Sequence, residues 1–155
     1  MAITASVETK CEQALVAGLQ NHADLAAINA HANFIRRYAD SSKEQNLPAC
    51  VVRTSEIHTP TNKDANHYTA LMEIEAITRK TADPAGDVAN SIIAATRDAF
   101  ATGATFITAL ESVGGIDVNQ TRRPPAYASD LRRSDAGINR TRTLLREIVV
   151  TMIPA

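Results

Sequence analysis

Arginine side chains crowd into one stretch of this 155-residue chain. Seven of its twelve arginines lie between Arg122 and Arg146. A guanidinium group presents its N–H donors in a rigid planar fork, which suits carboxylates and phosphates because each can accept two such bonds at once. We therefore expect this stretch to recognise anionic groups on a partner. The candidate partner-docking residues are Arg122, Arg123, Tyr127, Arg132, Arg133, Arg140 and Arg142.

Charge is unevenly divided between this stretch and the rest of the chain. Residues 120–147 carry seven basic and three acidic side chains, a net charge of +4, whereas residues 1–119 carry nine and fourteen, a net charge of −5. Pro124 and Pro125 lack a backbone N–H, so they favour neither a continuing helix nor a central strand. We therefore predict a basic arm over residues 120–143, extended and outside the core, and connections of that length are usually functional or disordered.

Three interpretations of the basic arm stay open. Its arginines could neutralise nucleic-acid phosphates, but single-strand binding usually needs several stacking aromatics, and Tyr127 is the only one in the arm. The overall net charge of −1 also argues against a general nucleic-acid binder. We favour a protein-docking loop whose arginines meet carboxylates. The third interpretation is a solvated loop with no specific role.

Residues that could support catalysis or metal binding are sparse. His58 and His67 flank a turn region that contains Asp64, and these three could form a metal site of a small enzyme. We favour solvated turn histidines, because no zinc-protease, C-x-x-C, phosphate-loop or nucleophile-elbow motif is present. We therefore expect no catalytic residue, no cofactor and no metal.

Glu73 and Glu75 are two residues apart on an expected strand, so both face the same side of a sheet. They could act as paired carboxylates, but we favour a solvated or subunit-facing sheet surface. Arg53 and Arg79 are their expected cross-strand partners. The candidate subunit-interface residues are Arg53, Glu73, Glu75 and Arg79.

Length and composition indicate one globular domain over residues 1–155, with 45% apolar residues and only 4% aromatics. A core poor in large side chains fits a protein that gains stability by self-association. No signal peptide and no membrane-spanning run are expected. Cys11 and Cys50 are predicted to be small buried hydrophobes, with a disulfide as the alternative.

Apolar spacing predicts the elements. Helices are expected over 5–20, over 24–39 with Asp24 as N-cap, and over 87–101 with Asp87 as N-cap. Strands are expected over 49–53, 68–78, 116–118 and 144–153, while residues 105–111 fit a helix or a strand.

The expected fold class is α+β. An antiparallel sheet carries helices on one face, and a long basic loop precedes the C-terminal strand. Strands 49–53 and 68–78 form a hairpin, and the C-terminal strand lies beside 68–78. The order is a helical region (5–39), then hairpin, helix and short strand (47–119), the basic arm (120–143), and the final strand (144–153).

This layout resembles a known family. An N-terminal helical region precedes a strand led by Leu47-Pro48, then come the alternating strand Tyr68–Thr78, the helix Asp87–Ala101, a long loop and a final strand. The order and size are similar to the tail-terminator (tail-completion) proteins of long-tailed bacteriophages and their relatives in the head–tail neck. The likeness covers most of residues 5–153.

The resemblance implies a structural role. Such a subunit forms a hexameric ring that caps the tail tube, stops its polymerisation and docks on the head–tail connector proteins. DNA passes through the bore of the ring, with no membrane involved and no catalysis. The protein would be assembled in the bacterial host cytoplasm and reside in the virion. The alternatives are a nucleic-acid-binding accessory protein that uses the basic arm, or another virion component such as a head-completion protein.

Overall fold

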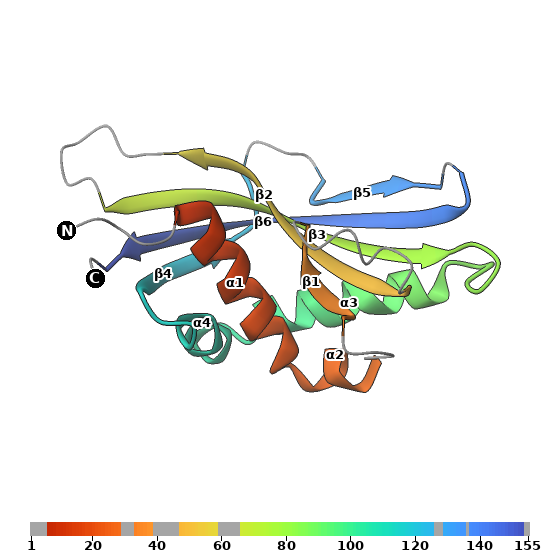
Figure 1. Cartoon of the computed structure of the whole chain (residues 1–155), viewed down its shortest axis with the longest axis horizontal. Coiled ribbons are helices and arrows are strands. Elements are labelled where there is room, and N and C mark those ends of the chain that lie inside the picture. Colours follow the sequence, from red (N-terminus) through yellow and green to blue (C-terminus); the bar gives the residue numbers. More distant parts are fainter. Residues whose placement is uncertain are drawn as a thin grey trace.

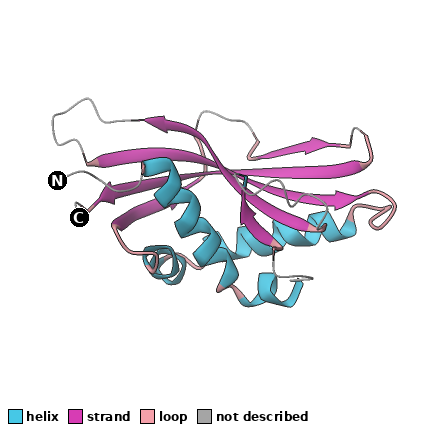
Figure 2. Ribbon diagram, viewed as in Figure 1, coloured by secondary structure: helices cyan, strands magenta, loops and turns pink. Residues whose placement is uncertain are grey.

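The protein has an α+β fold in which helices pack against a six-stranded, mostly antiparallel sheet (Figures 1 and 2). The computed structural model describes residues 6–28, 33–38, 47–58, 66–125, 129–135 and 137–153. The strand order is β1-β2-β3-β6-β4, and β5 also pairs with β6. This confirms the fold class expected from the sequence.

The described residues form four helices and six strands. The helices are α1 (Val7–Gln20), α2 (Ala23–Ile28), α3 (Asp87–Ala101) and α4 (Ala104–Glu111). The strands are β1 (Ile35–Arg37), β2 (Ala49–His58), β3 (His67–Arg79), β4 (Ile116–Arg122), β5 (Leu131–Ser134) and β6 (Asn139–Met152).

The centre of the sheet is the pair β3 and β6, which run antiparallel from His67↔Thr151 to Arg79↔Asn139. The predicted hairpin of β2 with β3 and the predicted place of the C-terminal strand are both confirmed. Alternate residues of β3, namely Ala70, Met72, Ile74 and Ala76, are fully buried in the core. Side chains two residues apart share a face, so this alternation places the core between the helices and one face of the sheet.

The other edge of β6 is shared by two strands. β4 pairs with the second half of β6, from Ile116↔Met152 to Arg122↔Glu147. β5 pairs with the first half, from Leu131↔Leu144 to Ser134↔Thr141. Figure 1 shows β5 alongside the end of β6 that lies away from the chain termini. The two strands therefore form one interrupted edge of the sheet.

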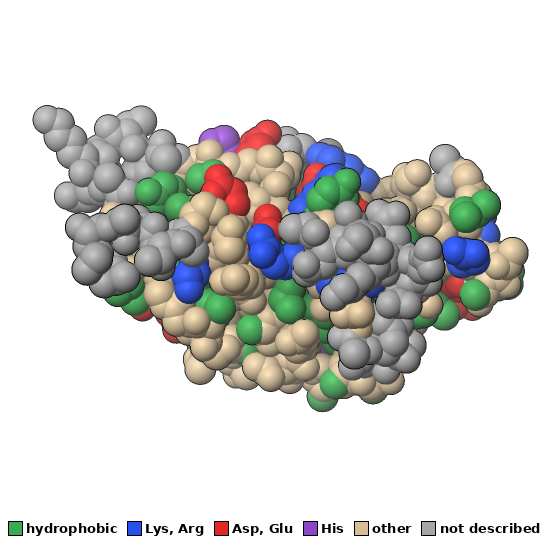
Figure 3. All heavy atoms as spheres, viewed as in Figure 1, with side chains coloured by type: hydrophobic (Ala, Val, Ile, Leu, Met, Phe, Trp, Pro, Cys, Tyr) green, Lys and Arg blue, Asp and Glu red, His purple; other side chains and the backbone are tan. Residues whose placement is uncertain are grey.

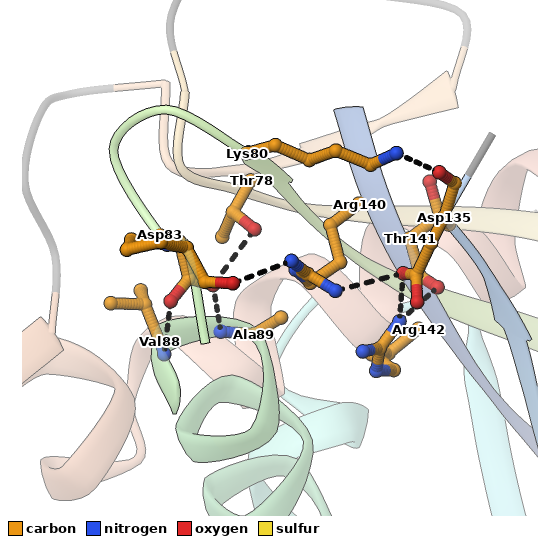
Figure 4. A network of polar contacts seen from close by, with 10 residues as sticks. Thr78, Lys80, Asp83, Val88, Ala89, Asp135, Arg140, Thr141 and Arg142 are labelled. Carbon is orange, nitrogen blue, oxygen red and sulfur yellow. Dashed lines mark hydrogen bonds and ion pairs between the residues drawn. The ribbon is translucent and has the colours of Figure 1, made fainter. Parts of the chain in front are cut away.

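The start of α3 depends on a residue outside the helix. The sequence predicts that Asp87 is the N-cap, but the N-cap is Gly86, which makes no side-chain capping bond. The side chain of Asp83 instead accepts from the backbone N–H groups of Val88 and Ala89, both at 3.1 Å (Figure 4). Asp83 also accepts from the Thr78 hydroxyl at 2.9 Å, so one carboxylate ties β3 to α3.

α1 and α4 approach each other closely at a glycine. A Cβ added to Gly18 would lie 2.9 Å from Leu110 Cδ2 and 3.1 Å from Phe106 Cε1. Glycine is therefore the residue that fits at position 18 without displacing the side chains of α4. The ring of Phe106 also packs edge-on against Phe100 of α3, with 4.7 Å between centroids, so α1, α3 and α4 share one apolar layer.

At each of the two edges of the sheet, a helix glutamate accepts a hydrogen bond from a backbone N–H of a strand. Glu12 of α1 accepts from the backbone N–H of Thr54 in β2 at 3.1 Å and binds Arg37 of β1 at 2.9 Å. Glu111 of α4 accepts from the backbone N–H of Val118 in β4 at 2.9 Å. Both N–H groups point away from the neighbouring paired strand.

Several predicted boundaries are wrong. The strands predicted over 49–53, 116–118 and 144–153 are longer, as β2, β4 and β6, and Asp24, the predicted N-cap, lies inside the first turn of α2. The second helix does not extend over 24–39, because α2 ends at Ile28 and residues 35–37 form β1, parallel to β2. Ile35 of β1 and the preceding Phe34 are buried. The apolar residue at position 35 therefore belongs to a strand and not to the apolar face of a helix. The basic arm is not an extended loop over 120–143, because β4, β5 and β6 all take residues from it.

Candidate docking surface

The arginines of the basic arm are held against the sheet by carboxylates. Of the seven arginines between Arg122 and Arg146, six lie within 4.0 Å of a carboxylate oxygen. The carboxylates are Glu73, Asp130, Asp135 and Glu147. The prediction that this stretch lies outside the core is therefore wrong for Arg142 and Arg146, which are buried.

One group of ion pairs lies on the sheet face opposite the helices. Arg53 of β2 binds both Glu73, through a short contact, and Glu75, at 3.2 Å. Arg132 of β5 reaches Glu73 from the other side at 3.5 Å. Glu73 is 4% exposed, so two cations compensate a carboxylate that would be costly to bury alone. We call these residues the sheet-face cluster.

The predicted pairing of Arg53 with both glutamates is confirmed, while that of Arg79 is wrong. Arg79 lies opposite Asn139 at the end of β3, is exposed and forms no ion pair with a described residue. Burial raises the pKa of Glu75. The positive charge of Arg53 acts to lower this pKa, and the negative charge of Glu73 acts to raise it further. The carboxylates of Glu73 and Glu75 are thus compensated by the guanidinium groups of Arg53 and Arg132.

A second group anchors the turn between β5 and β6. Asp135 binds Arg142 at 2.7 Å and Arg140 at 3.2 Å, and the Lys80 ammonium donates to its backbone carbonyl (Figure 4). Arg140 also donates to the carbonyl of Pro84 at 2.9 Å. The hydrogen bond from Arg142, with the charges of the nearby cations, lowers the pKa of Asp135. Arg140 and Arg142 are therefore anchors of the arm and are not displayed to a partner.

A third group surrounds Asp130, which directly precedes β5. Its carboxylate accepts from Arg146 at 2.6 Å and from Arg97 of α3 at 3.1 Å, and Arg123 lies 3.7 Å away. Burial works to raise the pKa of Asp130, but the bonds and charges of Arg146 and Arg97 outweigh it, so the pKa is lowered. The backbone carbonyl of Asp130 also accepts from the N–H of Leu145 at 2.8 Å.

Four of the described docking candidates are exposed, and one of them is Arg132 of the sheet-face cluster, whose side chain is 54% exposed. Arg122 is 44% exposed and binds Glu147 at 2.8 Å, and Arg123 is 73% exposed. Arg133 is exposed and makes no ion pair with a described residue. Tyr127 lies outside the described residues. Figure 3 shows basic and acidic side chains close together on the visible face, as this pairing requires.

Sequence reasoning missed the carboxylates that organise the arm. Asp130 and Asp135 flank the pair Arg132-Arg133 in the sequence, each separated from it by one residue. Acidic residues on both sides of an arginine pair indicate local ion pairs, so the sequence did contain a signal for these two carboxylates. The excess of arginines alone does not reveal it. Arg97 gave no signal, because it lies on α3, about thirty residues before Asp130 in the sequence.

The histidines and cysteines form no site in the described part of the chain. His58 contacts Glu56 at 3.1 Å and His67 contacts the Thr151 hydroxyl at 2.9 Å. No group of three potential metal ligands occurs among the described residues, and Asp64 lies outside them. Cys11 and Cys50 are buried free thiols, which confirms the predicted burial, and burial raises the pKa of each to about 12.

The fold and this surface define an α+β protein whose sheet has helices on one face and compensated charge on the other. No family model matches the chain, and no curated protein sequence shows significant similarity to it. Among the described residues, no helix has both the length and the hydropathy needed to cross a membrane.

Proposed function

We propose that this protein is a structural subunit of a bacteriophage neck or tail-terminator ring, which caps the tail tube and joins it to the head connector. The observation that carries the proposal is the sheet face without helices. It bears the sheet-face cluster, and the folded arm borders it through Arg132. A fixed, charged surface of this kind suits contact with another protein.

The distribution of charge supports assembly between unlike surfaces. The exposed arginines Arg122, Arg123, Arg132 and Arg133 belong to the arm. The exposed carboxylates of the described residues lie mainly on the helices and the hairpin, for example Asp24 and Glu56. Head-to-tail rings need two different complementary surfaces on each subunit, and the exposed arginines of the arm and the exposed carboxylates of the helices are candidates for them.

The alternative of a nucleic-acid-binding accessory protein has less support. Six of the seven arginines in the stretch already bind carboxylates of the same chain. Phosphate contacts at the paired nitrogens would compete with these bonds, and the net charge of −1 disfavours general binding of a long polyanion. A head-completion protein remains a variant of the same proposal, because it differs only in the neighbour that is bound.

The structure changes how the docking hypothesis is tested. Reversing the charges of Arg132 and Arg133 together would place a carboxylate at position 132 against the buried Glu73. That variant would confound folding with docking. Arg133→Glu alone tests docking cleanly, because Arg133 is exposed and unpaired among the described residues.

The decisive experiment is tube capping. The tube protein of the phage that encodes this chain is polymerised with and without the chain, and tube lengths are measured by negative-stain microscopy. We expect shorter tubes carrying one ring at an end, and a particle mass near six times 16.6 kDa. Unchanged tube lengths, with no chain bound at tube ends, would refute the proposal.

A further inference from the structure

A pocket lies between α3 and the end of β4. Its cavity measures about 340 Å³, a size at the lower end of ligand sites, and it opens to solvent. Four arginines line it, together with a few residues of α3 and β4. The residues that matter for its chemistry are Arg97, Asp98, Phe100, Arg122, Arg123 and Arg146.

The inner wall is rigid and cationic. The Arg146 side chain is 8% exposed, is fixed by Asp130 at 2.6 Å, and its guanidinium lies 5.6 Å from the centroid of the Phe100 ring. Arg97 shares the same carboxylate at 3.1 Å. The Nε of Arg97 is buried and has no hydrogen-bond acceptor among the described residues. One N–H of this lining residue therefore has no acceptor among the described residues, a state that proteins usually avoid.

The mouth of the pocket carries cations with spare donors. Arg123 is 73% exposed and only 3.7 Å from Asp130, which is longer than a hydrogen bond. Arg122 uses its Nε on Glu147, so its terminal nitrogens stay available. Four guanidinium groups thus face three carboxylates, those of Asp98, Asp130 and Glu147, which leaves one positive charge in excess.

We propose that this pocket binds carboxylate side chains of an acidic polypeptide segment on a partner subunit. The inner wall already holds one carboxylate, that of Asp130, between two guanidinium groups, so the geometry suits a second carboxylate beside it. The single excess positive charge of the pocket can be neutralised by one or two carboxylates of a bound segment. It does not match a phosphate backbone, which needs many cations in a row. This inference rests on the proposed function for the partner being a protein subunit.

The pocket is tested with a defined probe. A hexaglutamate peptide is titrated into the full chain at low salt, by calorimetry and by amide chemical-shift mapping. We expect saturable binding, with the largest shifts at residues 97–101 and 121–123. The double variant Arg122→Gln/Arg123→Gln should bind at least about tenfold more weakly, because two charge-assisted bonds are lost.

The matched control is Arg133→Gln, which removes an exposed arginine of the same arm outside the pocket. It should bind the peptide as the wild type does. Absence of peptide binding, equal loss in the control, or shifts confined to other regions would overturn the proposal. So would tighter binding of a six-nucleotide single strand in the same pocket. If tube capping fails but the peptide still binds, the error lies in the proposed function and not in the pocket.

Discussion

Replacing Asp83 tests how the structure joins β3 to α3. Asp83→Ala removes a capping carboxylate, which usually costs about 1 kcal/mol, since two backbone N–H groups of α3 lose their acceptor. It also leaves the buried Thr78 hydroxyl without its acceptor, which costs about 1–2 kcal/mol more. We therefore expect the free energy of unfolding to fall by about 2–3 kcal/mol.

The assay is urea denaturation followed by circular dichroism, with thermal melting as a second measure. For a chain of this length each kcal/mol lowers Tm by about 2–4 °C, so a fall of roughly 4–12 °C is expected. The control is Asp87→Ala, since Asp87 is exposed in the first turn of α3 and does not cap it. Its effect should stay below about 1 kcal/mol, from the helix dipole alone.

The pH dependence follows from the pKa of Asp83. Burial works to raise this pKa, but the bonds from Val88, Ala89 and Thr78 outweigh it, so the folded state has a lowered pKa. The stabilisation is therefore fully present above the unfolded pKa, about 3.9, and is lost as the pH falls through the lowered folded pKa. The advantage of wild type over Asp83→Asn should be constant from pH 7 to pH 5 and shrink below about pH 4.

Two results would refute this reasoning. The first is an Asp83→Ala variant within about 0.5 kcal/mol of wild type, the range usual for surface substitutions. The second is a larger loss for Asp87→Ala, which would restore the capping residue predicted from the sequence.

Three further predictions concern the thiols and the sheet-face cluster. Cys11 and Cys50 should not react with a maleimide at pH 8 until the protein unfolds, because burial raises the pKa of each to about 12. Glu73→Ala should lower the free energy of unfolding, measured in urea, by about 1–3 kcal/mol, because its bonds to Arg53 and Arg132 are lost. Arg133→Glu should leave stability within about 0.5 kcal/mol of wild type, whereas Arg132→Glu should be clearly destabilising, because it faces Glu73.

The strands that alternate cleanly could be read from the sequence. β3 and the second half of β6 place apolar residues at every second position, and their pairing is as predicted. The helix α3 was equally clear, apart from its cap. In each of these elements one face packs on the core, so the spacing of apolar residues is enough to predict the element.

The arm could not be read in the same way. The first half of β6, from Asn139 to Thr143, alternates between polar residue types, and β5 is only four residues long. Most of β5 is exposed. One of its links to the sheet is an ion pair between distant positions, Arg132 with Glu73, which are 59 residues apart, whereas Arg142 of β6 is held by the nearby Asp135. A hydrophobic period cannot report contacts of that kind. Asp130 and Asp135 lie close to the arginines in the sequence, whereas Glu73 is brought to Arg132 only by the fold.

The two glutamates that meet the sides of the sheet limit how copies of this protein can join. Glu12 and Glu111 each occupy a backbone N–H that a visiting strand would need for its ladder. An incoming strand would first have to displace a carboxylate, and its own carbonyls would then face that negative charge. Addition of a strand is therefore disfavoured at these points on both edges of the sheet. If copies of the chain assemble as proposed, their contacts would have to be made by side-chain surfaces.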